Sequence, residues 1–138
     1  MPITYSFDKE RRLIVTKVTG ELTIALTEDY FSRLQQDSNC PEEAIEIVDF
    51  SGVTDFTLTH GDMTKITQRY QSTKSTRVVR GTIFNCTSVL SYGIARMLQT
   101  FHAIANEKHT VIITRSQEEL AQSIEDLRSN QTDEGDLQ

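Results

Sequence analysis

The 138-residue chain lacks several features that would assign it to a class of protein. It has only two cysteines, Cys40 and Cys86, which are too few for a disulfide framework, so we expect a reducing, intracellular location. Nowhere do about 18 apolar residues follow one another, as a membrane-spanning helix requires. The first residues also lack the basic and apolar segments of a signal peptide. These absences predict a cytoplasmic protein that is not stably inserted in a membrane.

Positive charge is scarce as well. The chain has 14 basic and 20 acidic residues, which leaves a formal net charge of -6. An excess of negative charge repels phosphate backbones, so we do not expect nucleic acid as a partner. The sequence also contains no metal-ligand cluster, phosphate-binding loop or nucleophile motif. We therefore expect no metal, no cofactor and no enzymatic activity.

The clearest pattern that the sequence does contain lies between residues 78 and 107. The β-branched run from Val78 to Phe84 predicts a strand, and residues 85–88 predict a turn. Apolar residues then recur at spacings of three and four, which predicts an amphipathic helix that needs a sheet to cover its apolar face. These residues are Leu90, Ile94, Met97, Leu98, Phe101, Ile104 and Ala105.

Four further segments supply strands for that sheet. Residues 3–8 and 13–18 flank a charged turn and predict a β-hairpin, which Gly20 ends. Short apolar runs at residues 44–50 and 110–114 predict two more strands, the first of which stops at Ser51-Gly52. The sheet is therefore expected to have five strands.

Hydroxyl side chains mark the starts of the other helices. Thr23 or Thr27 can cap one helix, because a hydroxyl oxygen accepts a hydrogen bond from an otherwise unpaired backbone amide. Thr59 and Ser116 are each followed three residues later by a carboxylate, which is the capping-box pattern.

The order of these elements predicts a single α/β domain over residues 1–128. It is a mixed five-stranded sheet, an N-terminal hairpin followed by parallel strands, with four helices, because helical crossovers make the later strands parallel. Residues 129–138 show no apolar periodicity, so we predict a disordered acidic tail there.

Two segments resemble a known family. Residues 49–53, Asp-Phe-Ser-Gly-Val, resemble the strand-end signature of STAS domains, the family of anti-sigma-factor antagonists and of the cytoplasmic domains of sulfate transporters. Residues 92–97, Tyr-Gly-Ile-Ala-Arg-Met, resemble the SpoIIAA-like branch, which is related to both STAS and SEC14 proteins. With the order of elements, the resemblance covers roughly residues 3–128.

The resemblance implies a regulatory domain that docks onto a protein partner. Antagonists of this family are switched by phosphorylation of a Ser or Thr at a helix start, and Thr59 is the hydroxyl nearest to that position. The family has Asp-Ser-Ser-Gly there, whereas this chain has Thr-Leu-Thr-His at residues 57–60. Thr59 is thus a phospho-acceptor candidate whose role as a helix cap also accounts for its presence.

Several polar residues are expected at one end of the sheet, where the carboxyl ends of parallel strands and the starts of helices gather small ligands. The same residue types also serve as turn formers and caps, and a lone cysteine at a helix start is more often a small buried residue than a nucleophile. The ligand-binding candidates are Asp49, Ser51, His60, Asn85, Cys86, Tyr92, Gly93 and Arg96.

Three functions remain open from the sequence. The first is a non-enzymatic regulatory or binding domain, expected to be a homodimer, that binds a protein partner or a small apolar ligand. The second is a SEC14-like carrier of lipid or another small apolar molecule, with its pocket beside the helix that contains residues 89–101. The third is an uncharacterised enzyme that uses Cys86 or His60.

Overall fold

The structure is a computed structural model that describes residues 3–71, 78–105 and 110–136. Its elements follow one another in the order that the sequence predicts. They are β1 (Ile3–Asp8), β2 (Leu13–Leu22), α1 (Ile24–Gln36), β3 (Ala44–Phe56), α2 (His60–Gln71), β4 (Val78–Asn85), α4 (Val89–Ala105), β5 (Val111–Thr114) and α5 (Gln117–Asp136).

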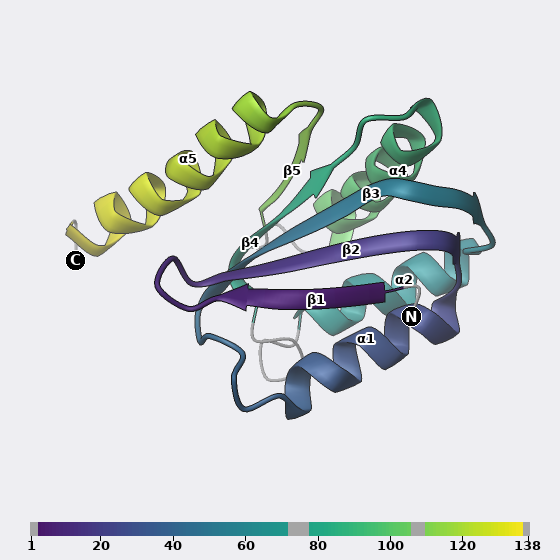
Figure 1. The fold of residues 1–138 in the computed structure, drawn as a ribbon, viewed down its shortest axis with the longest axis horizontal. Coiled ribbons are helices and arrows are strands. Elements are labelled where there is room, and N and C mark those ends of the chain that lie inside the picture. The colour runs from purple at the N-terminus through teal and green to yellow at the C-terminus, as the bar shows by residue number, and fades with distance from the viewer. Residues whose placement is uncertain (1–2, 72–77, 106–109, 137–138) are drawn as a thin grey trace.

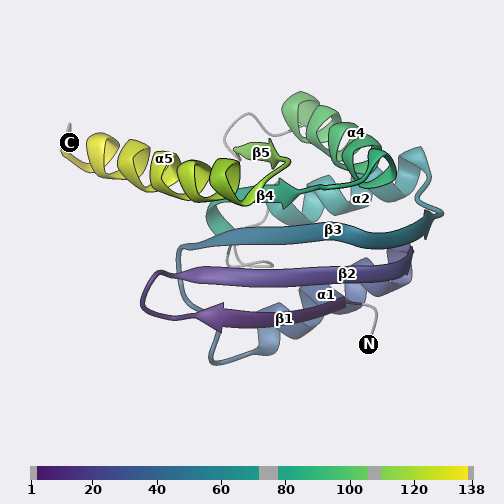
Figure 2. The same ribbon diagram turned by 45° about the horizontal axis from the view of Figure 1, so that its top comes forward.

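The five strands form one mixed sheet in the order β1-β2-β3-β4-β5. β1 and β2 are antiparallel, and each of the other neighbouring pairs is parallel. The predicted fold class is therefore confirmed. The strand order, which the sequence left open, follows the chain, so each helical crossover returns beside the strand just left (Figure 2).

The two faces of the sheet bury two separate hydrophobic cores, because successive side chains of a strand point to opposite faces. Val48 of β3 belongs to the larger core, which the sheet forms with α1, α2 and α4. Ile45 and Ile47 belong to a smaller core with Ile124 and Leu127 of α5. Each fully buried aliphatic side chain contributes about 1.5 to 3 kcal/mol to folding, so both faces are firmly held.

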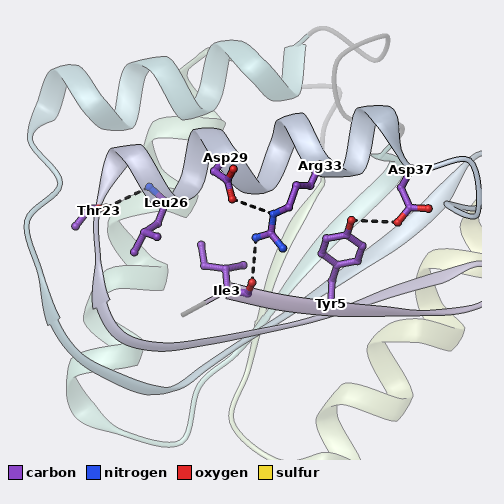
Figure 3. A network of polar contacts seen from close by, with 7 residues as sticks. All are labelled: Ile3, Tyr5, Thr23, Leu26, Asp29, Arg33 and Asp37. Atoms are coloured by element: carbon purple, nitrogen blue, oxygen red, sulfur yellow. Dashed lines mark hydrogen bonds and ion pairs between the residues drawn. The ribbon is translucent and has the colours of Figure 1, made fainter. Parts of the chain in front are cut away.

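Polar contacts attach α1 to the edge strand β1 (Figure 3). The guanidinium of Arg33 lies 2.9 Å from a carboxylate oxygen of Asp29 and donates to the backbone carbonyl of Ile3 at 3.0 Å. Further along, the hydroxyl of Tyr5 donates to the carboxylate of Asp37 at 3.1 Å. Side chains of α1 and of the residue that follows it therefore hold this helix against the edge strand.

The capping predictions are confirmed. Thr23 is the N-cap of α1, and its hydroxyl accepts from the amide of Leu26. Thr59 and Asp62 form a reciprocal capping box at the start of α2, with both bonds between 3.0 and 3.1 Å. Ser116 likewise accepts from the amide of Glu119 at the start of α5. Local side-chain chemistry alone thus fixes where these helices begin.

β3 is longer than the sequence predicts. The pattern ends the strand before Ser51-Gly52, but the structure continues it to Phe56, paired with an equally extended β2 after a register shift. A Cβ atom on Gly52 would lie 2.8 Å from Cγ2 of Thr19, so the neighbouring strand passes too close for a side chain. Gly52 therefore allows a close approach between strands rather than ending one.

The predicted disordered tail is wrong over residues 129–136. α5 runs without a break from Gln117 to Asp136 and extends past the strands (Figure 1). Once a helix is nucleated by its packed first turns, each added residue costs little, and no proline interrupts this segment. Residues 137–138 lie outside the described residues.

No helix in the described part of the chain is long and apolar enough to cross a membrane.

Candidate functional site

The carboxyl ends of β4 and β5 lie side by side at one end of the sheet, next to Asp49 in the middle of β3. Asp49 is in register with Asn85, and Asn85 is in register with Thr114, so two of the candidate residues are direct neighbours. Asn85 is buried, and its side-chain oxygen accepts from the hydroxyl of Thr114 at 3.0 Å. The sequence therefore placed Asn85 at a strand end correctly, whereas Asp49 lies inside the longer β3. Asn85 joins two strands instead of pointing into solvent.

Asp49 and Ser51 also contact neighbouring parts of the chain. The carboxylate of Asp49 accepts from the amide of Ser51 at 2.9 Å, which is a local turn contact of the kind Asp commonly makes. The hydroxyl of Thr87 donates to that of Ser51 at 2.8 Å and links the loop after β4 to β3. These bonds fix the conformation of β3 around Asp49 and Ser51 and join β3 to the loop that follows β4.

Cys86 is fully buried directly after β4, and its amide donates to the carbonyl of Thr114 at 2.8 Å. Burial raises the pKa of its thiol to about 11, and the nearby charge of Asp49 adds to the increase. A hydrogen bond with Ser91 and the charge of Arg115 act in the opposite direction but are outweighed. The thiol is therefore protonated near neutral pH, whereas a nucleophile must be a thiolate.

The start of α4 is closed by a pair of serines. Ser88 and Ser91 each accept from the backbone amide of the other at 3.1 Å, and their hydroxyls are 2.8 Å apart. This reciprocal arrangement satisfies amides at the start of the helix. These amides would otherwise be available to an anionic ligand.

Thr59 and His60 lie at the start of α2 and are exposed. The ring of His60 meets Phe101 of α4 edge-on, with ring centroids 5.6 Å apart. That contact is with an apolar side chain, which cannot orient the ring as a general base must be oriented. The hydroxyl of Thr59 is engaged in the capping box described above.

A groove of about 420 Å³ runs along β5, between α4 and α5. Tyr92 and Arg96, both candidates from the sequence, line it from α4, and Gln99 of the same helix donates to the carbonyl of Val111 at 3.0 Å. The guanidinium of Arg115 lies 4.7 Å from the centroid of the Tyr92 ring. The remaining lining residues are Ile112, Ile113 and Glu119.

Sequence reasoning missed the contribution of Arg115, Gln99 and Glu119 to this groove. Arg115 directly follows the last strand, which places it at the same carboxyl edge as Asp49 and Asn85. That position was a usable signal. Gln99 and Glu119 gave none, because a glutamine on a helix and a glutamate in a capping box are both common on ordinary surfaces.

The outward face of α4 is apolar in part and also carries the exposed Arg96 and Thr100. Val89 is 87% exposed, Leu90 40% and Met97 38%, and these are three of the four large hydrophobic side chains exposed among the described residues. Gly93 lies between them on the same face, and the space that its side chain would occupy is open. Gly93 is therefore not needed for packing within this chain.

A buried carboxylate also escaped sequence reasoning. Glu46 of β3 is 0% exposed, and its two oxygens accept from the hydroxyls of Tyr30 at 2.6 Å and Thr82 at 2.9 Å. Because the proton of Tyr30 goes to Glu46, the hydroxyl of Thr16, 2.7 Å away, donates to Tyr30. This chain of bonds joins α1 to three strands, which is a structural role.

The larger core contains a cavity of about 40 Å³ between the sheet and the helices. Thr16 and Tyr30 contribute to its wall, but most of the lining is aliphatic or aromatic. For comparison, an engineered cavity that binds benzene measures about 150 Å³.

No group of three or more His, Cys, Asp or Glu side chains among residues 3–71, 78–105 and 110–136 is placed to hold a metal ion.

The comparisons with known proteins concern the fold. No protein-family model matches the chain, and no curated protein matches it. Its structure is similar to that of an uncharacterised DUF3478-family protein from Shewanella loihica PV-4, described as having a SpoIIAA-like fold. The match covers 88% of this chain and 93% of that chain, with a TM-score of 0.51 and 11% sequence identity. The fold is SpoIIAA-like.

The SpoIIAA-like fold confirms the resemblance suggested by residues 49–53 and 92–97 and by the order of elements. Sequence identity this low carries information about the fold and none about activity. The binding roles of the candidate residues and the phosphorylation of Thr59 therefore stay predictions. Function has to be argued from the side chains of this chain.

Proposed function

We propose that this SpoIIAA-like chain is a non-catalytic protein-binding domain that docks its partner on the outward face of α4. The observation that supports the proposal is the gathering of exposed apolar side chains there: Val89, Leu90 and Met97. Large hydrophobic residues that stand together on a surface are characteristic of protein interaction sites. We call these three residues with Gly93 the α4 face.

The energetics favour a protein as the occupant of the α4 face. Burying apolar surface contributes roughly 25 cal/mol per Å², and a convex helix face buries most area against a complementary groove on another protein. The sequence of α4 contains no aspartate or glutamate, although the whole chain has a net charge of -6. The helix therefore adds no negative charge that would repel an acidic partner.

An enzyme based on Cys86 or His60 is less well supported. The raised pKa keeps the buried Cys86 thiol protonated, and the ring of His60 contacts Phe101. A nucleophile needs an adjacent base that is itself oriented by a third group. These two side chains do not provide that arrangement.

A lipid carrier is also less well supported. The apolar cavity holds about 40 Å³, whereas a cavity that binds a small aromatic ligand measures about four times this volume. To accept a lipid chain, α1 and α2 would have to move away from the sheet, which exposes the larger core. The partner is therefore expected to bind the α4 face on the surface and not the cavity in the larger core.

Paired surface variants test the proposal. Proteins captured from source cells by the wild-type chain would be purified, and the affinity of each would be measured by titration calorimetry. The α4 variant Val89→Ser/Met97→Ser removes two of the exposed apolar side chains. Its matched control, Val15→Ser, removes the fourth exposed hydrophobic side chain, which lies on β2.

The proposal predicts a captured protein whose Kd rises at least about tenfold with the α4 variant, equivalent to about 1.4 kcal/mol, and is unchanged with Val15→Ser. Circular dichroism should show that both variants stay folded, because the substituted side chains are exposed. Equal affinity of the wild type and the α4 variant for every captured protein would overturn the proposal.

A further inference from the structure

The groove along β5 gathers positive charge on a chain that is negative overall. The chain has 20 acidic and 14 basic residues, yet two arginines line this groove, Arg96 of α4 and Arg115 directly after β5. The sequence of α4 contains no aspartate or glutamate to offset them. An anion is therefore attracted here, although the net charge of -6 repels it from the molecule as a whole.

Arginines elsewhere in the described part of the chain form ion pairs with aspartate or glutamate, at distances of 2.9 to 3.9 Å. They include Arg11, Arg12, Arg33 and Arg69. Among residues 3–71, 78–105 and 110–136, no carboxylate lies within 4.0 Å of the guanidinium of Arg96 or Arg115. These two charges are therefore available to a ligand.

Tyr92 positions Arg115 at one end of the groove. The carbon of the guanidinium lies over the ring at 4.7 Å from its centroid, well within the distance of about 6 Å for a cation–π contact. A guanidinium that stacks by its face keeps the N–H groups at its edge, and these match the two oxygens of a carboxylate or phosphate. No hydrogen bond between the Arg115 side chain and another described residue occupies those groups.

Arg96 is positioned from the same helix. It follows Tyr92 by four residues, so both side chains lie on the same side of α4. One of its N–H groups donates to the side-chain oxygen of Gln99 at 3.2 Å, and the amide of Gln99 donates to the carbonyl of Val111 at 3.0 Å. Gln99 thus occupies this part of the strand edge and orients Arg96 in the groove. Tyr92 therefore lies beside both guanidiniums.

We propose that the groove binds a small molecule with two negative charges, a phosphate monoester or a dicarboxylate, between the guanidiniums of Arg96 and Arg115. Each arginine can form two parallel N–H···O bonds with a carboxylate or phosphate, and such bonds are roughly twice as strong as those between neutral groups. The groove volume of about 420 Å³ is ordinary for a small ligand. The half-buried Val111 and Ile113 line the wall and provide contacts for the carbon atoms of the ligand.

Glu119 opposes this binding and so provides a test of it. Its carboxylate accepts from the backbone amide of Arg115 at 2.6 Å, which holds a negative charge at the groove. Glutamine serves equally at this position of a capping box. Glu119→Gln therefore removes the charge and keeps the cap, and it should strengthen the binding of a dianion.

The first experiment titrates the purified chain with three defined probes: inorganic phosphate, glycerol 3-phosphate and succinate. Sodium chloride keeps the ionic strength constant, and NMR follows the backbone amides. The proposal predicts saturable shifts at Tyr92, Arg96 and Arg115 with at least one probe, and none when sodium chloride alone is varied. The phosphate and succinate titrations show which of the two anionic groups the groove prefers.

The second experiment compares variants with the probe that binds most tightly. Arg96→Gln and Arg115→Gln should each raise its Kd at least about tenfold. Arg11→Gln is the matched control, because it removes the same charge from an exposed arginine that is paired with Asp8 on the opposite edge strand, and it should leave Kd unchanged. Glu119→Gln should lower Kd by roughly threefold, a size typical of one exposed charge pair.

Two results would overturn the proposed site. One is the absence of saturable shifts in the groove with all three probes. The other is an Arg11→Gln variant that weakens binding as much as Arg96→Gln does, because the response would then follow net charge alone. The α4 variant Val89→Ser/Met97→Ser should bind the probe as the wild type does. Failure of this site would therefore leave the α4 face untouched, and the two proposals are independent.

Discussion

At the scale of single residues, burial decides what the polar groups near the sheet edge can do. Cys86 and Asn85 are candidate site residues in the sequence and Glu46 is not, yet each of the three is buried and bonded to a neighbouring strand or helix. A polar group buried in this way stabilises the fold, and removing its partner costs more than the bond itself contributes. These residues are therefore best tested through stability.

The first residue-scale prediction concerns pH. The pKa of Cys86 is raised from 9.0 to about 11, and burial with a hydrogen bond to Asp37 also raises the pKa of Tyr5. Between pH 9 and pH 11 the Cys86 thiol loses its proton in the unfolded chain and keeps it in the folded chain. Stability is thus fully present below pH 9 and falls as the pH rises toward 11, by at most about 2.7 kcal/mol for Cys86.

Urea unfolding at pH 8 and at pH 10.5 measures this loss, and Cys86→Ala should reduce it because the titrating thiol is gone. A thiol-reactive dye should also label the native protein slowly at neutral pH and rapidly in urea, since both cysteines are buried. Labelling of Cys86 in the native protein as fast as in urea would contradict the buried, protonated thiol.

The second residue-scale prediction concerns Glu46. Glu46→Ala leaves the hydroxyls of Tyr30 and Thr82 without their acceptor and opens a space in the core. We expect the free energy of unfolding to fall by about 3 kcal/mol or more, as measured by urea denaturation. The exposed Glu21→Ala serves as the control and should change it by less than about 0.5 kcal/mol. Equal effects of the two substitutions would show that the buried bonds contribute little.

At the scale of elements, the sequence predicts helix starts better than strand ends. Caps are local, so Thr59 and Ser116 could be identified from a few neighbouring residues, and the first cap could be narrowed to Thr23 or Thr27. The end of β3 could not, because Ser51-Gly52 looks like a turn and only the position of Thr19 on β2 shows why glycine is needed. α5 was underestimated for a related reason: polar residues can extend a helix that is anchored elsewhere.

The close approach of β2 and β3 gives an element-scale prediction. Gly52→Ala places a Cβ atom 2.8 Å from Cγ2 of Thr19 and 3.2 Å from the carbonyl oxygen of Val18, so the strands must separate. We expect a loss of about 1 to 3 kcal/mol in the free energy of unfolding. In the Thr19→Ser background the loss should be smaller, because the nearest methyl group is gone. An additive double mutant would argue against direct contact between the two positions.

At the scale of the whole molecule, the sequence predicted the α/β class and the mixed sheet, because hydrophobic periodicity and element order determine them. It placed Asp49 and Asn85 at one edge for the same reason. It did not predict the strand order, the groove along β5 or the apolar α4 face, since each depends on which elements become neighbours after folding. The residues with the strongest claim to a binding role are accordingly those that folding leaves exposed.

The molecule, as proposed, acts through its outer surface and not through an interior pocket. Native mass spectrometry of the chain freshly purified from its own cells tests this most directly, because it weighs every molecule that remains bound. We expect the additional masses, if any, to be those of protein chains or of a small dianion. A lipid or another small apolar molecule retained in proportion to the chain would contradict it and would return the carrier function to first place.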